Sequence, residues 1–561
     1  MNNRIRILSV FMIILFVAII IRLFYIQVID SAYYKELGIG QYIATHSENE
    51  QRGSIYFSRQ DGTLISAATM SNGYILAITP KLIKETDLVY KKISDIYPID
   101  HDIFYEKVLK KDDPYEEIAH RIPKDIALKI QDLKISGITI ARESWRNYPG
   151  GSRAAHVLGL VAYSGEYEEG VYGLERLFEK ELVNSNEHTS VNPFAAVFRN
   201  LGNDTNSRHD IVTTIEPEIQ IALEKTISDV QVMYESEGVG GIVINPKTGE
   251  ILAMAYTPSF DPNFPSQATE ESVFLNPAVS KVYEFGSIIK PLVVSAALDT
   301  DSINQETKFN DEGFIKVGVE TIHNFDNKGR GVVTIKEILG QSLNTGMVMI
   351  MQKLGQKNMR LYFKKFGLRD KIGIDLPSEI NSLTSNLDSN REIEFAAASF
   401  GQGFAVTPVQ VVRAFSSLAN GGVPANPHVV KEIRTQDGVI IKSFEPTFLD
   451  SALKPETAKE ISIVLTHVVD MSLQNGTLAF PHHSVAAKTG TAQMVGPDGK
   501  YSDDRYLHSM FAYIPASDPK YLVFLYNVYP KGVEYASASL SKPLFSYLQF
   551  LISYGTIKPD R

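Results

Sequence analysis

The 561-residue chain contains no cysteine. It can therefore form no disulfide framework, has no thiol nucleophile and offers no thiolate ligands to a metal. A protein without cysteine also has no thiol to protect when it works in an oxidising compartment. This absence excludes several classes of enzyme and metalloprotein, and it suits a chain that is exported.

Positive charge is scarce relative to negative charge. With 55 Lys and Arg against 65 Asp and Glu, the formal net charge is −10 at pH 7, which argues against a general nucleic-acid binder. The sequence has no P-loop, no H-E-x-x-H motif and no dinucleotide fingerprint. His482 and His483 are adjacent rather than four residues apart, so they do not form a helical pair of metal ligands. We therefore expect neither a cofactor nor a bound metal.

Long apolar runs are absent except at the N-terminus. There, Arg4 and Arg6 precede a predominantly apolar stretch that runs to Ile29, with Arg22 near its outer end. About 20 apolar residues span a bilayer, and basic residues before the span place the N-terminus in the cytoplasm. A cleaved signal peptide is the alternative, but no small-x-small cleavage site follows the run. We expect a cytoplasmic tail at residues 1–6, a single transmembrane anchor at 7–29 and the rest of the chain outside the cytoplasmic membrane.

Three short motifs in one order indicate a serine acyl-transfer site whose base is a lysine. They are Ser287-Ile-Ile-Lys290, Ser342-Leu-Asn344 and Lys488-Thr489-Gly490. Each motif alone is weak, because S-x-x-K recurs at Ser451, Ser517 and Ser539, and K-T-G recurs at Lys247. The order of the three and their surroundings select one set.

Ser287 has the context that a nucleophile needs. It follows Gly286 and precedes the apolar run that begins at Pro291, which predicts a buried helix with the serine in its first turn. Residues three apart share a helix face, so the Lys290 amine can reach the Ser287 hydroxyl. Because proline disrupts an established helix, Pro291 predicts a tight 3₁₀-like opening turn. The rival serines lack a following apolar helix or lie in a turn.

The Ser342-Leu-Asn344 motif lies between two predicted helices. A capping-box pattern from Thr334 to Glu337 opens the first, and the run 347–354 forms the second. The motif therefore lies on a connection, from which side chains can point into a cleft. Taken alone, it could equally be a pair of capping residues in a helix–helix turn.

The two K-T-G triplets differ in their surroundings. Lys247-Thr-Gly249 follows a proline between the strand-like runs 241–245 and 250–256, which predicts a hairpin turn. Lys488-Thr489-Gly490 precedes the strand candidates 507–514 and 521–528, which predicts a strand at the edge of a site. Its glycine would let substrate or backbone approach closely.

The chain resembles the class B penicillin-binding proteins, which are monofunctional peptidoglycan D,D-transpeptidases. In two places it departs from the family pattern near the nucleophile: Phe285 replaces the usual proline, and both middle residues of the S-x-x-K tetrad are isoleucine. Besides the three motifs, the resemblance rests on Arg52-Gly-Ser-Ile-Tyr56, Arg146-Asn-Tyr-Pro149, Ala154-Ala-His-Val-Leu-Gly159, Gly170-Val-Tyr-Gly-Leu-Glu175, Thr213-Thr-Ile-Glu-Pro-Glu-Ile-Gln220, Gly401-Gln-Gly403 and Val406-Thr-Pro-Val-Gln410.

The resemblance also implies the architecture. Strands and helices are mixed rather than strictly alternating after about residue 211, which indicates an α+β fold. The family implies a transpeptidase domain at 211–561 with an antiparallel sheet flanked by helices, like a serine β-lactamase. It implies a mixed α/β pedestal of the dimerisation type at 30–210, and the turn-forming stretch 200–207 is the predicted junction.

The resemblance further implies a role for each site residue. A serine hydroxyl needs a base, and burial together with a neighbouring cation would keep the lysine of the tetrad neutral enough to serve. The implied roles are Ser287 as nucleophile, Lys290 as base, Ser342 as proton relay, Asn344 as the partner of the donor amide, Lys488, Thr489 and Thr491 as the carboxylate site, Gly490 as the point of close approach, and the N–H groups of Ser287 and Thr491 as the oxyanion site.

The implied partners are peptidoglycan stem peptides ending in D-Ala-D-Ala, the nascent glycan, β-lactam antibiotics and a membrane-embedded glycan polymerase of the SEDS type. Two alternatives differ in outcome. In a D,D-carboxypeptidase or β-lactamase, water would resolve the acyl-enzyme. In a penicillin-binding sensor or scaffold, the fold would bind without turnover.

Overall fold

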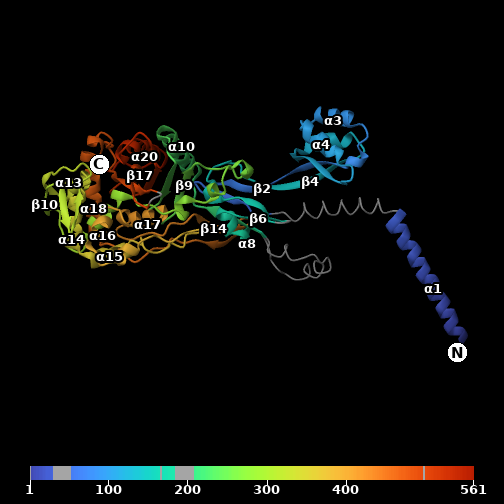
Figure 1. The fold of residues 1–561 in the computed structure, drawn as a ribbon, viewed down its shortest axis with the longest axis horizontal. Helices are drawn as coiled ribbons and strands as arrows, with labels where there is room; N and C mark the ends of the chain where they lie inside the picture. Colours follow the sequence, from blue (N-terminus) through green and yellow to red (C-terminus); the bar gives the residue numbers. More distant parts are fainter. Residues whose placement is uncertain (1, 30–51, 165–166, 184–207, 497–498) are drawn as a thin grey trace. The chain divides into compact units, whose positions relative to one another are not determined.

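The computed structural model describes residues 2–29, 52–164, 167–183, 208–496 and 499–561 (Figure 1). The chain divides into two compact units, one of Met1–Arg52, Met70–Asn147 and Ser185–Gly202, the other of Gly53–Thr69, Tyr148–Asn184 and Asn203–Arg561. The predicted junction at 200–207 lies outside the described residues. The boundaries predicted at 30, 210 and 211 stay predictions.

The N-terminal helix α1 spans Asn2–Phe24 and continues as a short π-helical turn, Tyr25–Ile29. Its apolar side chains, such as Phe11 and Phe16, are exposed. Among the residues that the structure describes, no helix has the length and apolarity needed to cross a membrane. The transmembrane anchor expected at 7–29 is therefore not confirmed and stays a prediction.

The first unit is a small α/β layer with its own apolar core. Strand β2 crosses from the other unit, and its second half pairs antiparallel with β3. Leu76, Phe104 and Ile122 are fully buried in the core. The elements are β2 (Leu64–Ile78), α3 (Thr86–Ser94), α4 (His101–Leu109), β3 (Glu116–Ile122), α5 (Lys124–Asp132) and β4 (Ile138–Asn147).

The second unit contains a mixed sheet built from distant segments. The strands lie in the order β15-β14-β7-β1-β2, and β1 pairs parallel with β7, which is about 150 residues further along the chain. This pairing brings residues 55–56 next to residues 211–212, which are distant in the sequence. The elements are β1 (Ile55–Ser58), α6 (Ala155–Leu158), β5 (Val161–Ser164), β6 (Tyr167–Gly170), α7 (Gly173–Leu177), α8 (Glu179–Leu182), β7 (His209–Thr213), β14 (Val430–Thr435) and β15 (Ile440–Ser443).

A five-stranded antiparallel sheet forms the centre of the second unit, in the order β16-β17-β18-β8-β9. Every residue of β18 is buried, as expected for a central strand covered on both faces. The strands predicted at 507–514 and 521–528 and the hairpin at Lys247 are all present. The elements are β8 (Gly238–Ile244), β9 (Ile251–Thr257), β16 (Ala486–Val495), β17 (Tyr501–Ile514) and β18 (Tyr521–Val528).

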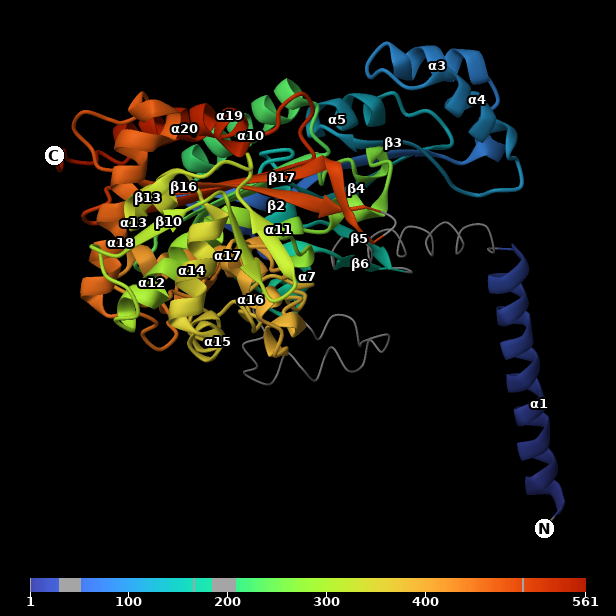
Figure 2. The same ribbon diagram turned by 60° about the vertical axis from the view of Figure 1, so that its left-hand side comes forward.

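Helices cover both faces of this sheet (Figures 1 and 2). Helices α10 (Pro217–Tyr234) and α20 (Ser541–Tyr554) pack on one face through Leu223 and Leu548. On the other face lie α12 (Lys290–Asp299), α17 (Pro408–Ala419) and α18 (Pro455–His467), where Phe415 stacks on Phe511. The predicted antiparallel sheet with flanking helices is thus confirmed. Beyond α12 lie the hairpin strands β10 (Lys308–Asp311), β11 (Phe314–Val317), β12 (Glu320–His323) and β13 (Gly331–Thr334), and helices α13 (Ile335–Gly340), α14 (Asn344–Leu354), α15 (Gln356–Lys365) and α16 (Glu392–Ser399).

Candidate active site

Ser287 lies in a tight turn at the start of α12. Residues Gly286–Ile289 form a 3₁₀ turn, and the α-helix begins at Lys290 with Pro291 in its first turn. Proline fits there because its missing N–H would have no helical acceptor, so the predicted opening turn is confirmed. Ser287 is half-buried, whereas all residues of α12 are buried. The turn thus presents the serine at the end of a helix fixed in the core.

Two glycines allow the chain to pack against this turn. Gly286 has φ +64°, a left-handed conformation that side chains disfavour, and its N–H donates to the carbonyl of Gly401 at 3.0 Å. A Cβ on Gly401 would overlap the Gly286 carbonyl, so Gly401 must also be glycine. The Gly401-Gln-Gly403 segment therefore packs directly against the turn that carries Ser287.

Lys290 is fully buried and bonded to the Ser342 motif. Its Nζ donates to the Ser342 carbonyl at 2.7 Å, to Ser342 Oγ at 3.2 Å and to Asn344 Oδ1 at 2.8 Å. Within the described residues it makes no hydrogen bond to Ser287 Oγ. Burial, and secondarily the nearby Lys488, hold the pKa of Lys290 well below its ordinary value. Burial therefore shifts the equilibrium of this amine toward its neutral form.

The Ser342-Leu-Asn344 motif forms the connection between α13 and α14. The Thr334 and Glu337 capping box that was predicted to open the first helix is present. Ser342 has φ +56°, which is uncommon for a residue with a side chain and is held here by the surrounding contacts. Its carbonyl and hydroxyl both face Lys290 as a result.

The second helix begins earlier than its sequence pattern predicted. The predicted start was residue 347, but α14 begins at Asn344. The reason is a contact that the sequence does not reveal: Asn324 Oδ1 accepts the N–H of Thr345 at 3.3 Å and so caps the extra turn.

Lys488 approaches the same hydroxyl from β16, the edge strand of the sheet. Its Nζ donates to Ser342 Oγ at 3.1 Å and to the Thr489 carbonyl at 2.8 Å. Burial lowers the pKa of Lys488 to about 7, so this amine is only partly charged at neutral pH. Ser342 Oγ consequently lies within hydrogen-bond distance of two amines, Lys290 Nζ and Lys488 Nζ.

Gly490 allows β16 to approach the nucleophile turn. A Cβ at this position would lie 2.5 Å from the Phe285 carbonyl and 2.6 Å from Ser509 Oγ. Ser509, its partner on β17, donates its hydroxyl to that same carbonyl at 2.8 Å. No sequence motif points to Ser509, because only the strand register places it next to Gly490.

The two threonines follow on the edge strand. Thr489 and Thr491 are half-buried, and Thr491 Oγ1 accepts the N–H of Ala536 at 3.0 Å. That contact uses a lone pair and leaves the Thr491 hydroxyl hydrogen able to donate to a ligand. Because β16 is an edge strand, its outer backbone groups are not used by the sheet.

The rival serines have other partners. Ser451 Oγ donates to the carbonyl of Leu453, Ser517 Oγ donates to Asp560, and Ser539 Oγ bonds to His508. Each partner is something other than the lysine of its own S-x-x-K tetrad. The Ser287 tetrad differs from these in that its lysine bonds to the Ser342 motif, which Lys488 also contacts.

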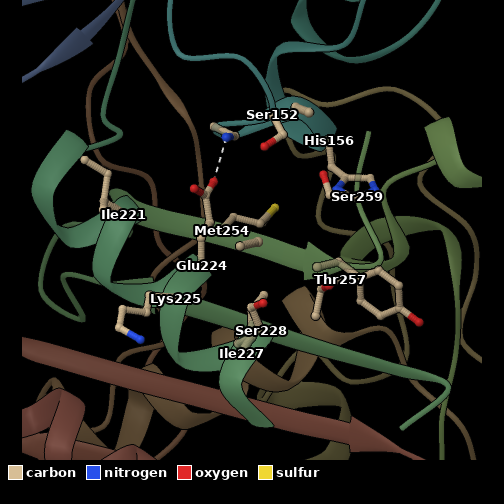
Figure 3. Close-up of a pocket in the computed structure, with 14 residues that line it drawn as sticks. Ser152, His156, Ile221, Glu224, Lys225, Ile227, Ser228, Met254, Thr257 and Ser259 are labelled. Atoms are coloured by element: carbon tan, nitrogen blue, oxygen red, sulfur yellow. Dashed lines mark hydrogen bonds between the residues drawn. The ribbon is translucent and has the colours of Figure 1, made fainter. Parts of the chain in front are cut away.

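A separate cavity of about 360 Å³ lies between α6, α10 and β9 (Figure 3). Glu224 lines it and accepts the N–H of Ala154 at 2.8 Å, and burial lowers the pKa of His156 on its wall to about 4. Lys225 at its rim pairs with Asp229. None of the eight predicted site residues lines this cavity.

Comparison with known protein families gives two matches. Residues 239–548 match the penicillin binding protein transpeptidase domain, and residues 47–204 match the penicillin-binding protein dimerisation domain. Together the two matched segments include the Arg52 segment, the nucleophile turn and the Lys488 strand.

Curated relatives match along most of the chain. Stage V sporulation protein D of Bacillus subtilis is 29% identical over 557 residues, which cover 97% of this chain and 84% of that protein. Peptidoglycan D,D-transpeptidase FtsI of Escherichia coli is 26% identical over 449 residues, covering 79% of this chain and 73% of that protein.

Solved structures share the fold. Penicillin binding protein 3 of Mycobacterium tuberculosis complexed with ampicillin has a TM-score of 0.69 at 24% identity, covering 91% of this chain and 96% of that one. Its apo form has a TM-score of 0.66 at 28% identity, covering 74% and 92% of the two chains.

Proposed function

The chain belongs to the penicillin-binding protein transpeptidase family and is a class B peptidoglycan D,D-transpeptidase, and on that premise we propose that Ser287 forms its acyl-enzyme. The observation that supports this most is the position of Ser342 Oγ. It lies 3.2 Å from the Nζ of Lys290, three residues after Ser287, and 3.1 Å from Lys488 Nζ. Two amines around one hydroxyl provide a route along which a proton can move.

In the proposed acylation, Ser287 Oγ attacks the carbonyl of the penultimate D-alanine. Lys290, whose neutral form burial favours, takes the hydroxyl proton as the C–O bond forms. The N–H groups of Ser287 and Thr491 stabilise the oxyanion. The proton then passes through Ser342 Oγ to the nitrogen of the terminal D-alanine, the C–N bond breaks, and D-alanine leaves.

The second half-reaction restores the enzyme. An amine from a neighbouring stem peptide attacks the acyl-enzyme ester, its proton returns through the same groups, and the Ser287 hydroxyl is released. The new amide is the cross-link. No metal or cofactor is needed in either half-reaction.

Substrate recognition depends on the N–H and O–H groups of the site that can still donate a hydrogen bond to the donor peptide. Asn344 Oδ1 is occupied by Lys290, and Nδ2 donates one hydrogen to the His323 carbonyl at 3.2 Å. The second Nδ2 hydrogen can donate to a carbonyl of the donor peptide. Lys488 and the Thr489 and Thr491 hydroxyls bind the terminal carboxylate, and an arriving carboxylate raises the pKa of Lys488 and so favours its charged form.

β-Lactams would acylate the same serine, because their ring amide takes the place of the peptide bond of the donor. The structural relative complexed with ampicillin supports this proposal by its fold. An acyl-enzyme that resists attack by water would leave the protein inactive.

We further propose that residues 7–29 anchor the chain by a single pass, with everything after residue 30 outside the cytoplasm. The supporting observations are the apolar run and the two preceding arginines. Peptidoglycan lies outside the membrane, so the site must face that side. A membrane-embedded glycan polymerase of the SEDS type is the proposed partner.

A donor peptide ending in D-Ala-D-Ala, incubated with a free amine acceptor, tests the activity. The expected products are the transpeptidation product and one equivalent of D-alanine, both absent with Ser287→Ala. Release of D-alanine without any acceptor product would instead indicate a carboxypeptidase. Rapid hydrolysis of a chromogenic cephalosporin would indicate a β-lactamase.

A further inference from the structure

A buried carboxylate lies directly behind the Ser342-Leu-Asn344 motif. Asp311, at the end of β10, is only 2% exposed. Its Oδ1 accepts from Gly313 N at 2.9 Å, Asn324 Nδ2 at 3.0 Å and Thr345 Oγ1 at 2.8 Å, and its Oδ2 accepts from Asn324 Nδ2 at 2.9 Å and Arg330 N at 3.0 Å. The donors come from three separate segments of the chain.

Two of these donors, Thr345 and Asn324, also link Asp311 to the Ser342-Leu-Asn344 motif. Thr345 directly follows Asn344 in the first turn of α14, and its N–H donates to Asn324 Oδ1 at 3.3 Å. Asn324 in turn follows His323, whose carbonyl accepts Asn344 Nδ2 at 3.2 Å. Asn344 therefore precedes one residue that Asp311 binds, Thr345, and its side chain bonds to His323, the neighbour of another, Asn324.

Burying these polar groups is unfavourable in free energy unless each of them is hydrogen-bonded. A buried carboxylate needs hydrogen bonds or a cation to offset its lost hydration. Arg330 gives Asp311 only its backbone N–H, and its guanidinium pairs with Asp326 instead. The partners of Asp311 are neutral N–H and O–H groups, which fix direction as well as energy. Asn324 and Thr345 are themselves 2% and 0% exposed. Such a network specifies one arrangement of the segments that it joins.

We propose that Asp311, acting through Thr345 and Asn324, positions the Asn344 amide for catalysis. The amide is oriented with Oδ1 toward Lys290 Nζ, which leaves the second Nδ2 hydrogen for the donor peptide. Asp311 and Thr345 are then positioning residues rather than catalytic ones. This inference rests on the proposed function of the site.

Paired substitutions at Thr345 separate positioning from packing. Thr345→Val keeps the shape but loses the hydroxyl that Asp311 binds, whereas Thr345→Ser keeps the hydroxyl. We expect Thr345→Val to slow the first-order acylation step with a penicillin by at least about tenfold, with the preceding binding constant nearly unchanged, because a hydrogen bond to a charged group is worth that much. Thr345→Ser should acylate at close to the wild-type rate.

A matched control lies elsewhere in the same unit. Thr457, in the first turn of α18, donates its hydroxyl to the buried carboxylate of Asp299 at 2.9 Å. Thr457→Val removes an equivalent bond far along the chain from the motif. It should lower the Tm about as much as Thr345→Val does and leave the acylation step unchanged.

The outcomes are distinguishable. If wild-type protein is acylated and Thr345→Val is acylated equally fast, the positioning role is wrong while the proposed function stands. Equal losses in Thr345→Val and Thr457→Val would also overturn it, since they would reflect packing alone. If Thr345→Val does not fold, Asn324→Asp, which places a second carboxylate against Asp311, must slow acylation. Failure of wild-type acylation would overturn both proposals.

Discussion

Replacing the buried lysine by arginine tests the base directly. Lys290→Arg keeps a positive charge and hydrogen-bond donors, but a guanidinium stays protonated at any physiological pH. In the native site the amine is 0% exposed, and its pKa is lowered by burial and by Lys488. Arginine would therefore place a permanent charge where the fold favours a neutral group, and it could not accept the Ser287 proton.

The expected loss of acylation rate is the loss caused by removing a general base. General-base catalysis contributes about 100-fold or more, or about 3 kcal/mol of barrier. The larger guanidinium must also fit among the Ser342 carbonyl, Ser342 Oγ and Asn344 Oδ1, which all lie within 3.2 Å of Lys290 Nζ. We expect the rate of acylation by a fluorescent penicillin to fall by at least about 100-fold, measured by stopped-flow or gel labelling.

The control uses another lysine of an S-x-x-K tetrad. Lys454, three residues after Ser451, donates to the Asp299 carbonyl and lies outside the site. Lys454→Arg should acylate at the wild-type rate. Acylation of Lys290→Arg within about threefold of wild type would refute the assignment of the base, because a general base typically contributes about 100-fold or more.

Three further predictions concern charge, packing and topology. Burial lowers the pKa of Lys488 to about 7 in the folded state, from about 10.5 in the unfolded chain, so the folded state binds fewer protons between these two pH values. In calorimetry, the Tm of wild type should therefore rise more from pH 7 to pH 9 than the Tm of Lys488→Met. Parallel curves of Tm against pH would contradict this. Gly490→Ala would press a methyl group against the Phe285 carbonyl. We expect the free energy of unfolding in urea to fall by about 1–3 kcal/mol and acylation to be slower. Unchanged stability would show that β16 can move away from the nucleophile turn. Protease added outside spheroplasts should degrade the catalytic domain, and deleting residues 1–29 should give a soluble protein that still binds penicillin; protection until lysis would exclude an outward-facing domain.

Local features of the sequence predicted much of the site. Pro291 indicated the 3₁₀ opening turn, and the structure confirms it. The inference works because the N–H that proline lacks has no partner in the first turn of a helix. The surroundings of Lys247 correctly predicted a hairpin turn rather than a second site. Turn chemistry and helix capping depend on neighbouring residues, so they can be predicted from the sequence.

Contacts between distant segments could not be predicted in this way. The early start of α14 depends on Asn324, and the attachment of Lys290 to the Ser342 motif depends on how two helices pack. The sequence also left open whether Phe285, in place of the usual proline, alters the lining of the site. Its side chain is 1% exposed and packs on Phe524 and Tyr526 in the core, so only its carbonyl faces β16.

Mass spectrometry of the intact protein after incubation with a penicillin tests the central claim most directly, when it is followed by mapping of the modified peptide. We expect a single adduct, carried by Ser287 and absent from Ser287→Ala. An adduct on Ser451, Ser517 or Ser539, or labelling that persists in Ser287→Ala, would contradict it.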